Sequence, residues 1–197
     1  RLNLKNSIMT FEEDIREALK TLRDNGIVLY PTDTIWGLGC DATNDTAVEK
    51  IFRIKAREEG KSLLILVNGE QMLERYVKEI PDTALQILSV TDTPLTIIYP
   101  QGKNLAKGVC SEDGSVGIRI CMDEFCNQLI SRFRKPIVST SANLSGQPSP
   151  AIFDDIDNEI IKSVDYVVNH RQDDRQKQSA SPVIKINSDG TLKIIRK

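Results

Sequence analysis

The sequence predicts a mixed α/β or α+β fold, in which helices pack on a twisted open sheet. Amphipathic helical segments alternate with short apolar segments along the first two thirds of the chain, and several strand-like segments cluster at its end. The composition can build a core, because 40% of the 197 residues are hydrophobic and no internal repeat is present. We therefore expect an N-terminal extension over residues 1–9 and a single domain over residues 10–197.

The first two helices carry start signals. Thr10 and Glu13 have the spacing of a capping box, apolar residues then recur at helical spacing, and Gly26 supplies a stop. Thr46 and Glu49 repeat the capping-box spacing ahead of a second apolar stripe, so we expect the second helix to begin there. Further helices are expected over residues 70–77, 81–88, 124–133 and 157–163.

Short apolar runs predict the strands. The run over residues 63–67 contains no polar residue, which is typical of a strand that is buried on both faces. The expected strands cover residues 27–29, 63–67, 95–99, 116–120, 137–139, 166–168, 183–186 and 192–195. The polar segment over residues 171–178 predicts an exposed loop, for which we expect mobility rather than order.

The bulk properties argue against several classes of protein. A formal net charge of −2 does not suit a dedicated nucleic-acid binder, although a local basic cleft is compatible with it. The four cysteines include no CxxC pair and the chain has one histidine, so we expect free, buried thiols in a reducing cytoplasm and no zinc site. We expect no membrane segment and no signal peptide, because no stretch is long and apolar enough.

Residues 30–39 have the most unusual composition in the chain. They follow the first strand and place Thr32, Thr34, a carboxylate and the only tryptophan between a proline and two glycines. We expect Pro31 to stiffen the turn, and the glycines to allow positive φ and a close approach of the backbone. A hydrophobic core does not require this mixture of residues, so the segment predicts a binding site for a small polar ligand.

Two later segments also combine polar groups with the end of an apolar element. Lys55 and Arg57 would point in different directions inside a helix, so their cooperation requires the second helix to end near Lys55. Cations at a helix end can simply favour the dipole, but an arginine fork and a mobile lysine also suit a triphosphate. Residues 139–146 are rich in hydroxyls, a composition common in turns, yet they follow an apolar strand, where ligand loops occur.

Other polar residues leave alternatives open. Arg119 lies inside an apolar strand, where an unpaired charge is costly, and either a substrate carboxylate or an internal acidic residue could be its partner. Residues 37–42 have the Gly-x-Gly-x-x-Ala spacing of a dinucleotide-binding fingerprint but lack its strand-to-helix context. Lys61 lies in a Gly-Lys-Ser segment like the end of a P-loop, but here a helix precedes the loop and a strand follows it, the reverse of a P-loop. A phosphate contact from Lys61 is the part of that reading that stays open. We expect His170 at the surface, because no motif supports a hydrolase triad.

The segments together, in this order, resemble the YrdC-like family, the threonylcarbamoyl-AMP synthases. The chain reads Pro31-Thr32-Asp33-Thr34, then Trp36-Gly37-Leu38-Gly39, then Lys55-x-Arg57, and later Ser141-x-Asn143 before Leu144-Ser145-Gly146. The resemblance extends from about the first helix to the last strand. It implies a YrdC-like catalytic domain with a concave, locally basic cleft. It also implies that L-threonine, bicarbonate and ATP form threonylcarbamoyl-AMP and pyrophosphate, toward threonylcarbamoyladenosine in tRNA.

The resemblance also implies roles for individual residues. The residues expected to be catalytic are Lys55, Arg57, Ser141 and Asn143. Those expected to bind L-threonine are Thr32, Thr34, Arg119 and Ser139. Those expected to bind ATP are Lys55, Arg57, Lys61, Ser115, Ser141, Asn143, Ser149 and Arg196. Mg²⁺ is expected mainly on the ATP phosphates, with no metal site made by the protein, and the expected partners are downstream subunits of a tRNA threonylcarbamoyl transferase.

The chain departs from the family pattern after Arg57. Many members have an Arg-Pro-x-x-x-Pro-Leu run and a histidine at the end of the next strand, whereas this chain has Leu66 at the histidine position. A related synthase with a different amine substrate is therefore a second hypothesis. A third is a non-catalytic module that binds double-stranded RNA or tRNA. Longer members carry a second domain, and we expect the short form here.

Overall fold

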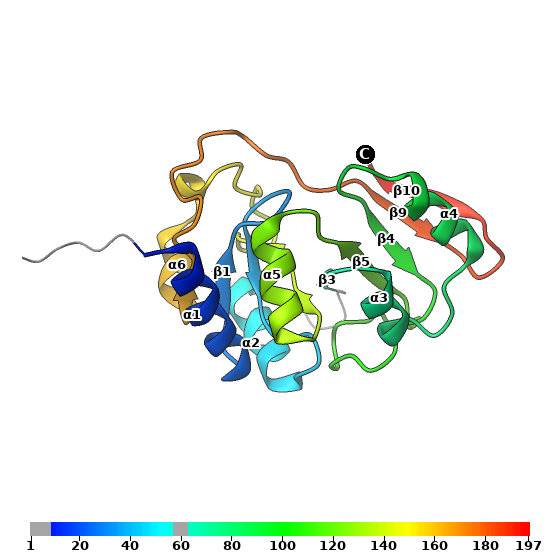
Figure 1. The fold of residues 1–197 in the computed structure, drawn as a ribbon, viewed down its shortest axis with the longest axis horizontal. Coiled ribbons are helices and arrows are strands. Elements are labelled where there is room, and N and C mark those ends of the chain that lie inside the picture. The colour runs from blue at the N-terminus through cyan, green and yellow to red at the C-terminus, as the bar shows by residue number, and fades with distance from the viewer. Residues whose placement is uncertain (1–8, 57–62) are drawn as a thin grey trace, which may run out of the picture.

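The structure is a computed structural model that describes residues 9–56 and 63–197 (Figure 1). Its helices are α1 (Phe11–Arg23), α2 (Asp45–Lys55), α3 (Glu70–Tyr76), α4 (Asp82–Val90), α5 (Glu124–Phe133), α6 (Asn158–Ser163) and the short 3₁₀ helix η1 (Phe153–Asp155). Its strands are β1 (Val28–Tyr30), β2 (Gly37–Gly39), β3 (Ile65–Val67), β4 (Thr96–Tyr99), β5 (Val116–Ile120), β6 (Ile137–Val138), β7 (Thr140–Ser141), β8 (Tyr166–Val167), β9 (Val183–Ile186) and β10 (Leu192–Arg196).

The strands form two mixed sheets flanked by helices, which confirms the predicted class of fold but divides the expected sheet in two. The smaller sheet has the order β7-β2-β1-β8 and the larger one the order β10-β9-β4-β5-β3-β6. In Figure 1, α1 and α6 flank the small sheet, α3 and α4 flank the large sheet, and α5 stands between them. The chain crosses from β8 back to β9 along the upper edge of this view, so residues 168–182 connect the two sheets.

One continuous apolar core joins the sheets and helices. Leu29 and Leu38 of the small sheet, Ile65 and Ile118 of the large sheet, and Leu129 of α5 are all buried and belong to this core. The amphipathic pattern of α5 explains its position, because its buried residues recur at helical spacing and face both α1 and β3. The residues predicted for β5 and α5 are those observed.

The sequence predicts the start of α1 and the end of α2 correctly but misplaces the start of α2. Thr10 and Glu13 form the predicted capping box at α1. The predicted start of α2 at Thr46 is wrong, because the Asn44 side chain accepts the Ala47 N–H at 2.9 Å and caps the helix two residues earlier. The predicted end of α2 is confirmed at Lys55, and Ala56 then adopts the left-handed conformation with φ 48°.

Two short strands, β2 and β7, occur where the sequence predicts a turn and a loop. In β2, Gly39 lies opposite Val28, and an added Cβ on Gly39 would lie 2.4 Å from the Tyr30 ring. The expected close approach of the backbone is therefore confirmed, but neither Gly37 nor Gly39 has positive φ, so that part of the prediction is wrong.

His170 is half-buried and is not the surface residue that the sequence predicts. Its ring packs against the rings of Phe11 and Phe125, with centroid distances of 5.0 and 5.7 Å. The buried Asp14 carboxylate holds this segment, because it accepts the backbone N–H groups of Asn169 at 3.0 Å and His170 at 2.6 Å. A local contact with α1 thus overrides the polar character of the sequence around His170.

Residues 171–178 have no regular secondary structure and are half-buried or exposed, in agreement with the predicted loop. The loop is attached at several points. Arg171 donates to the Thr32 carbonyl at 2.9 Å, Arg175 pairs with Asp154, and the Gln178 N–H donates to the Ala151 carbonyl at 3.1 Å. These contacts tie the loop to the polar turn after β1 and to the segment before η1.

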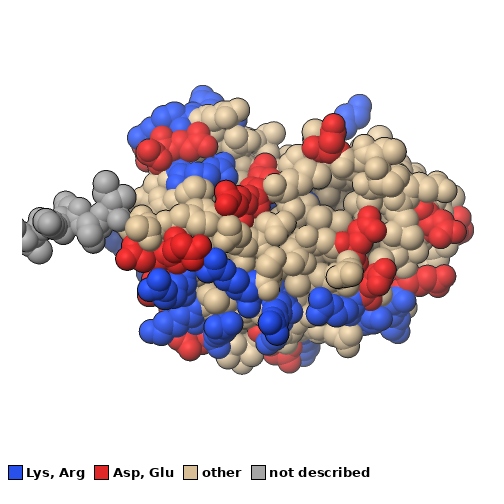
Figure 2. All heavy atoms as spheres, in the orientation of Figure 1, with Lys and Arg blue, Asp and Glu red and all other residues tan. Residues whose placement is uncertain are grey.

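The cysteines and surface charges agree with the bulk composition. All four cysteines are free, and three of them are buried while Cys110 is half-buried. Lys and Arg gather along the lower edge in Figure 2, where α1 and α5 end and where Lys20, Arg23 and Arg132 occupy last turns. Cations are favourable at such helix ends, which accounts for this group without a ligand. In the described part of the chain, no helix is long and apolar enough to cross a membrane.

Candidate active site between the two sheets

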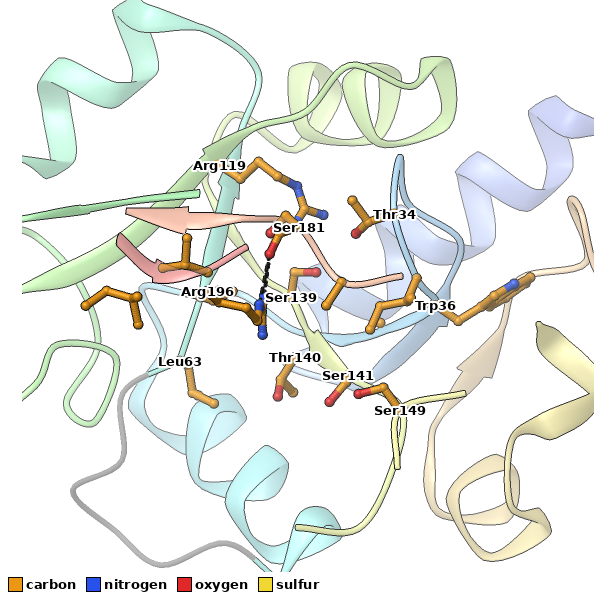
Figure 3. A pocket seen from close by; sticks show the side chains of 16 residues that line it. Thr34, Trp36, Leu63, Arg119, Ser139, Thr140, Ser141, Ser149, Ser181 and Arg196 are labelled. Carbon is orange, nitrogen blue, oxygen red and sulfur yellow. Dashed lines mark hydrogen bonds between the residues drawn. The ribbon is translucent and has the colours of Figure 1, made fainter. Parts of the chain in front are cut away.

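A cavity of about 370 Å³ lies where the two sheets meet (Figure 3). The turn before β2 and the strand β7 form one wall, with Thr34 and Ser141 among its residues. The strands β5 and β10 form the opposite wall, with Arg119 and Arg196. Ser181, from the connection that precedes β9, completes it. The cavity thus collects polar side chains from segments far apart in the sequence.

The turn after β1 is held by the hydroxyl of Thr32. This hydroxyl donates to the Ile35 carbonyl at 2.7 Å, accepts the Thr34 N–H at 3.0 Å and lies 3.2 Å from the Thr34 hydroxyl. Because the single proton of Thr32 is used on Ile35, the Thr34 hydroxyl must be the donor between the two threonines. The lone pairs of Thr34 are then available at the cavity, which Thr34 lines and Thr32 does not.

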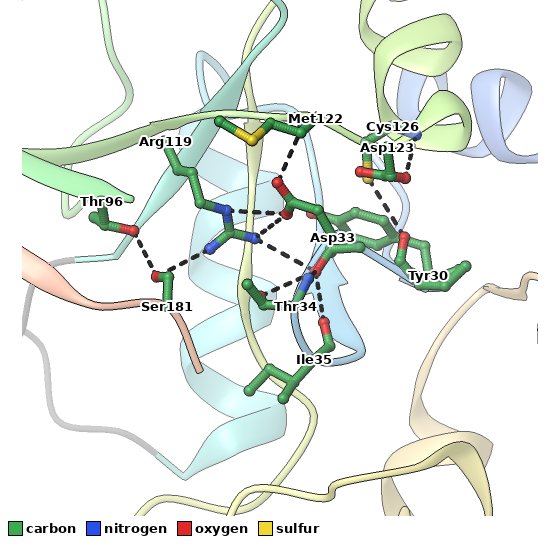
Figure 4. A network of polar contacts seen from close by, with 12 residues as sticks. Tyr30, Asp33, Thr34, Ile35, Thr96, Arg119, Met122, Asp123, Cys126 and Ser181 are labelled. Atoms are coloured by element: carbon green, nitrogen blue, oxygen red, sulfur yellow. Dashed lines mark hydrogen bonds and ion pairs between the residues drawn. The ribbon is translucent and has the colours of Figure 1, made fainter. Parts of the chain in front are cut away.

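Arg119 is buried at the C-terminal half of β5 and pairs with Asp33 (Figure 4). Its Nε donates to Asp33 Oδ1 at 3.1 Å, and its Nη2 lies at the same distance from that oxygen. The other carboxylate oxygen of Asp33 accepts the Met122 N–H at 3.1 Å. The internal acidic residue that the sequence left open as a partner is therefore Asp33. This pairing points Nη1 toward Ser181 and the cavity.

Ser181 joins the two cationic residues of the cavity and was not found from the sequence. Its hydroxyl lies 3.3 Å from Arg119 Nη1 and 2.8 Å from Thr96 Oγ1. Its carbonyl accepts Arg196 Nε at 2.9 Å and Nη2 at 2.8 Å. A serine in a polar connection has no distinctive sequence signal, and only the pairing of β9 with β4 brings it beside Arg119.

Burial lowers the pKa of the Arg196 guanidinium, and the neighbouring Arg119 charge lowers it further. An arginine remains protonated even so. Two guanidinium groups therefore face one cavity, no Asp or Glu of the described residues lines it, and Asp33 pairs with Arg119 behind the lining. This excess of positive charge favours an anionic ligand.

The loop after β7 is stabilised by Lys55 and Asn143. Lys55, at the end of α2, donates to the carbonyls of Ser141 and Asn143, the latter at 2.9 Å. The Asn143 amide donates to the carbonyls of Leu144 at 3.0 Å and Gln147 at 2.8 Å. Among the described residues, the buried Asn143 Oδ1 has no hydrogen-bond partner. The loop presents Ser141 and Ser149 to the cavity.

The structure brings six of the predicted site residues to the cavity and leaves others away from it. Those that line it are Thr34, Arg119, Ser139, Ser141, Ser149 and Arg196. Thr32, Lys55 and Asn143 lie behind the lining and hold it, as described above. Ser115 lies just before β5, and its hydroxyl donates to the Asp113 carboxylate at 2.6 Å. It does not line the cavity. Arg57 and Lys61 lie outside the described residues. The ligand roles of all these residues stay predictions.

Leu66 is fully buried in β3 and does not line the cavity. It lies directly opposite Arg119 in the parallel pair of β3 and β5, so the two side chains share a face of the sheet. An apolar side chain at this position supplies no hydrogen bond to a ligand.

The residues near the cavity suit neither a covalent nucleophile nor a protein-held metal ion. Burial raises the pKa of the Cys121 thiol to about 12 and that of the Cys126 thiol well above its ordinary value, so neither is a thiolate. Residues 9–56 and 63–197 contain no group of three or more His, Cys, Asp or Glu residues that could hold a metal ion. A Mg²⁺ ion at this cavity would need its oxygen ligands from a bound phosphate and from water.

The chain is similar in sequence to several known proteins. The Sua5/YciO/YrdC family model, described as "Telomere recombination", matches residues 20–197. The threonylcarbamoyl-AMP synthase of Psychromonas ingrahamii is 36% identical over 137 residues, which cover 68% of this chain and 72% of that protein. The putative threonylcarbamoyl-AMP synthase of Methanocaldococcus jannaschii is 35% identical over 202 aligned residues. The match covers 98% of this chain and 94% of that protein.

A solved structure has the same fold. The crystal structure of P. abyssi Sua5 complexed with L-threonine matches this chain with a TM-score of 0.78 and 27% identity. The match covers 90% of this chain and 52% of the solved one, so this chain spans about half of that protein's length.

Proposed function

This chain belongs to the Sua5/YciO/YrdC family, and from that premise we propose that it is a threonylcarbamoyl-AMP synthase. The enzyme is a nucleotidyltransferase that forms threonylcarbamoyl-AMP and pyrophosphate from L-threonine, bicarbonate and ATP, for the modification of tRNA. One observation supports this most strongly: a single cavity is lined by two arginines, Arg119 and Arg196, together with the hydroxyl residues Thr34, Ser139, Ser141 and Ser149.

The end of the cavity near β5 suits the amino acid. Arg119 keeps Nη1 toward the cavity and can donate to the substrate carboxylate, since Asp33 occupies only its Nε and Nη2 side. Thr34 offers lone pairs, which accept a proton from the substrate amine or hydroxyl. Ser139 lines the cavity within the same wall.

The other end suits the nucleotide. Ser141, Ser149 and Arg196 supply two hydroxyls and one guanidinium to it. Arg57, by family resemblance, and Lys61, by its likeness to the lysine of a P-loop, contribute further positive charge to the phosphates. A Mg²⁺ ion held by the ATP phosphates and water would screen the phosphate charge, as in other phosphoryl and nucleotidyl transfers.

The reaction needs no protein nucleophile. The threonine amine takes up carbon dioxide, derived from bicarbonate, and loses a proton to give a carbamate. A carbamate oxygen then forms a bond to the α-phosphorus, the bond from that phosphorus to the bridging oxygen breaks, and pyrophosphate leaves with the electron pair. Arg119 and Thr34 orient the carbamate, while Arg196 offsets the charge that grows on the phosphates.

The direct test is pyrophosphate release with ATP, bicarbonate and individual amino acids, together with mass spectrometry of the adenylate. We expect release that requires both L-threonine and bicarbonate. Arg196→Met should lose most of this activity, whereas Lys193→Met on the same strand should retain it. Release that is independent of added threonine and bicarbonate would show that the proposal is wrong.

The buried Leu66 favours one alternative, a synthase of the same chemistry with another amine substrate. The amino-acid panel decides it, because a different preferred amine would replace threonine in the same assay. The RNA-binding alternative predicts affinity that falls steeply with salt and ignores threonine, which a filter-binding titration measures. Transferase subunits that accept threonylcarbamoyl-AMP are the partners we propose downstream.

A further inference from the structure

We propose that Lys55 is a positioning residue, which shapes the loop over residues 141–147 for the nucleotide instead of contacting a phosphate. This inference rests on the proposed function in taking ATP as the ligand of that loop. It gives the lysine of the Lys-x-Arg segment a different role from the one that the sequence predicts.

The first observation is the place of the Lys55 ammonium group. The residue is 2% exposed, and it is not among the residues that line the cavity. Its Nζ donates to the carbonyls of Ser141 and Asn143 and lies 3.4 Å from the Ser141 hydroxyl. A buried ammonium group is costly unless acceptors surround it, and these acceptors belong to the loop. Lys55 therefore fixes two carbonyls, two residues apart, on one side of the chain.

The second observation is that the backbone of Lys55 holds the same loop. The Ser145 N–H donates to the Lys55 carbonyl at 2.9 Å. This carbonyl is accessible because α2 ends here, where Ala56 turns into the left-handed region with φ 48° and ψ 41°. A non-glycine residue adopts that conformation only at an energetic cost, which the contacts of Lys55 with the loop help to offset.

The third observation is how the loop is completed. The Asn143 amide bridges the carbonyls of Leu144 and Gln147, and the Gln147 N–H donates to the Leu144 carbonyl at 3.1 Å. Lys55 and Asn143 thus turn the loop's carbonyls inward, while Ser141 and Ser149 face the cavity. The serines can bind the nucleotide only where this arrangement places them.

The two roles for Lys55 predict different effects of its loss on the binding of ATP and of AMP. If Lys55 contacts the β- or γ-phosphate, its loss weakens ATP binding and leaves AMP binding unchanged. If Lys55 shapes the loop, its loss weakens ATP and AMP by the same factor. We expect a loss of about tenfold or more for both nucleotides, the usual effect of removing hydrogen bonds to a charged group.

Calorimetric titration of the Lys55→Met protein with ATP and with AMP measures this ratio. Lys50→Met is the matched control, because Lys50 lies on the same helix and also donates to a main-chain carbonyl, that of Asn25 at 2.9 Å. We expect the control to bind both nucleotides as the unmodified protein does. A loss confined to ATP would overturn the proposal.

Hydrogen exchange gives a second readout that requires no enzymatic activity. In Lys55→Met, the amides of Ser145 and Gln147 should exchange about tenfold faster or more, whereas Lys50→Met leaves them unchanged. Unchanged exchange in Lys55→Met would overturn the proposal. If Lys55→Met does not fold, Lys55→Gln takes its place, since it keeps an amide donor. A protein that binds ATP but forms no adenylate would refute the proposed function and leave this inference standing.

Discussion

Arg119 can be both charged and buried because Asp33 lies against it. Their side chains are 4% and 6% exposed, and breaking such a buried pair costs about 3–5 kcal/mol of stability. A substitution of Asp33 would therefore test the fold as much as the site. The pair also weakens the attraction of Arg119 for a substrate carboxylate, because Asp33 already offsets part of the guanidinium charge. Selectivity then depends on the neighbouring hydroxyls, above all on Thr34.

Thr34 and Thr32 should respond differently to the same substitution. Thr34→Val removes lone pairs that face the cavity, so we expect the KM for L-threonine to rise about tenfold with little change in stability. Thr32→Val removes the donor to Ile35 and the acceptor for the Thr34 N–H, so we expect a loss of about 1–3 kcal/mol of unfolding free energy. Steady-state kinetics and urea unfolding of both variants separate the two effects. An unchanged KM in Thr34→Val would remove that hydroxyl from substrate binding.

Elements with a strong local pattern could be predicted from the sequence, and those made by tertiary pairing could not. The amphipathic α5 and the apolar β5 were predicted to the residue. The strands β2 and β7 have two or three residues without an apolar alternation, and they exist because Leu38 pairs with Leu29 on one side and Thr140 on the other. The predicted start of α2 was wrong because Asn44 and Thr46 are both suitable N-cap residues, and it is Asn44 that caps the helix.

The candidate site shows the same division. The family resemblance named Arg119, Ser149 and Arg196, and the structure brings them to one cavity. It could not reveal Ser181, which lies 62 residues from Arg119 in the sequence and contacts it only through the sheet. It also gave no sign that Lys55 points into the loop backbone. Residue types can be predicted from motifs, whereas their hydrogen-bond partners depend on the fold.

The element β2 requires glycine at its end. A Cβ on Gly39 would lie 2.4 Å from the Tyr30 ring and 2.8 Å from the Val138 carbonyl, both of them buried. We therefore expect Gly39→Ala to lose about 1–3 kcal/mol of unfolding free energy, the usual cost of overpacking a core. Gly69→Ala is the control, since nothing lies within 4 Å of its added Cβ, and we expect a change of about 1 kcal/mol or less. Equal losses in urea unfolding would contradict this account.

The N-terminus of α5 predicts a pH dependence of stability. Asp123 Oδ2 accepts the Cys126 N–H at 3.0 Å, while Oδ1 is buried without a partner in the part of the chain that the structure describes. Burial, more than the nearby Asp33 charge, raises the pKa of Asp123 above its ordinary value. The folded protein therefore holds this proton more tightly than the unfolded chain. Its contribution to stability is complete below the ordinary pKa and is lost as the pH rises through the folded-state pKa.

Asp123→Asn tests this dependence, because asparagine caps a helix as well as aspartate and carries no charge at any pH. We expect the variant to gain stability relative to the unmodified protein between about pH 4 and about pH 7. Asp157→Asn at the N-terminus of α6 is the matched control, because the Asp157 side chain also caps its helix but is exposed. Urea unfolding at both pH values measures the two differences. A variant that loses relative stability toward neutral pH would have the opposite sign.

At the scale of the whole molecule, the cavity depends on the relation between the two sheets. The small sheet contributes Thr34 and Ser141, the large sheet contributes Arg119 and Arg196, and the connection over residues 168–182 joins them (Figure 1). Ligands that span the cavity therefore contact both sheets at once. Their binding then stabilises the folded chain, because the site does not exist in the unfolded chain.

Ligand binding should therefore raise the thermal unfolding temperature of the whole chain. At a concentration of about 100 times its Kd, each ligand contributes about 2.7 kcal/mol, which corresponds to about 5–10 °C for a protein of this size. Calorimetry with L-threonine and with ATP measures the two shifts. Thr34→Val should reduce the threonine shift and leave the ATP shift intact, while Arg196→Met should do the reverse, because the proposed function assigns Thr34 to the amino acid and Arg196 to the nucleotide. If both variants lose both shifts equally, the cavity is not divided into an amino-acid end and a nucleotide end.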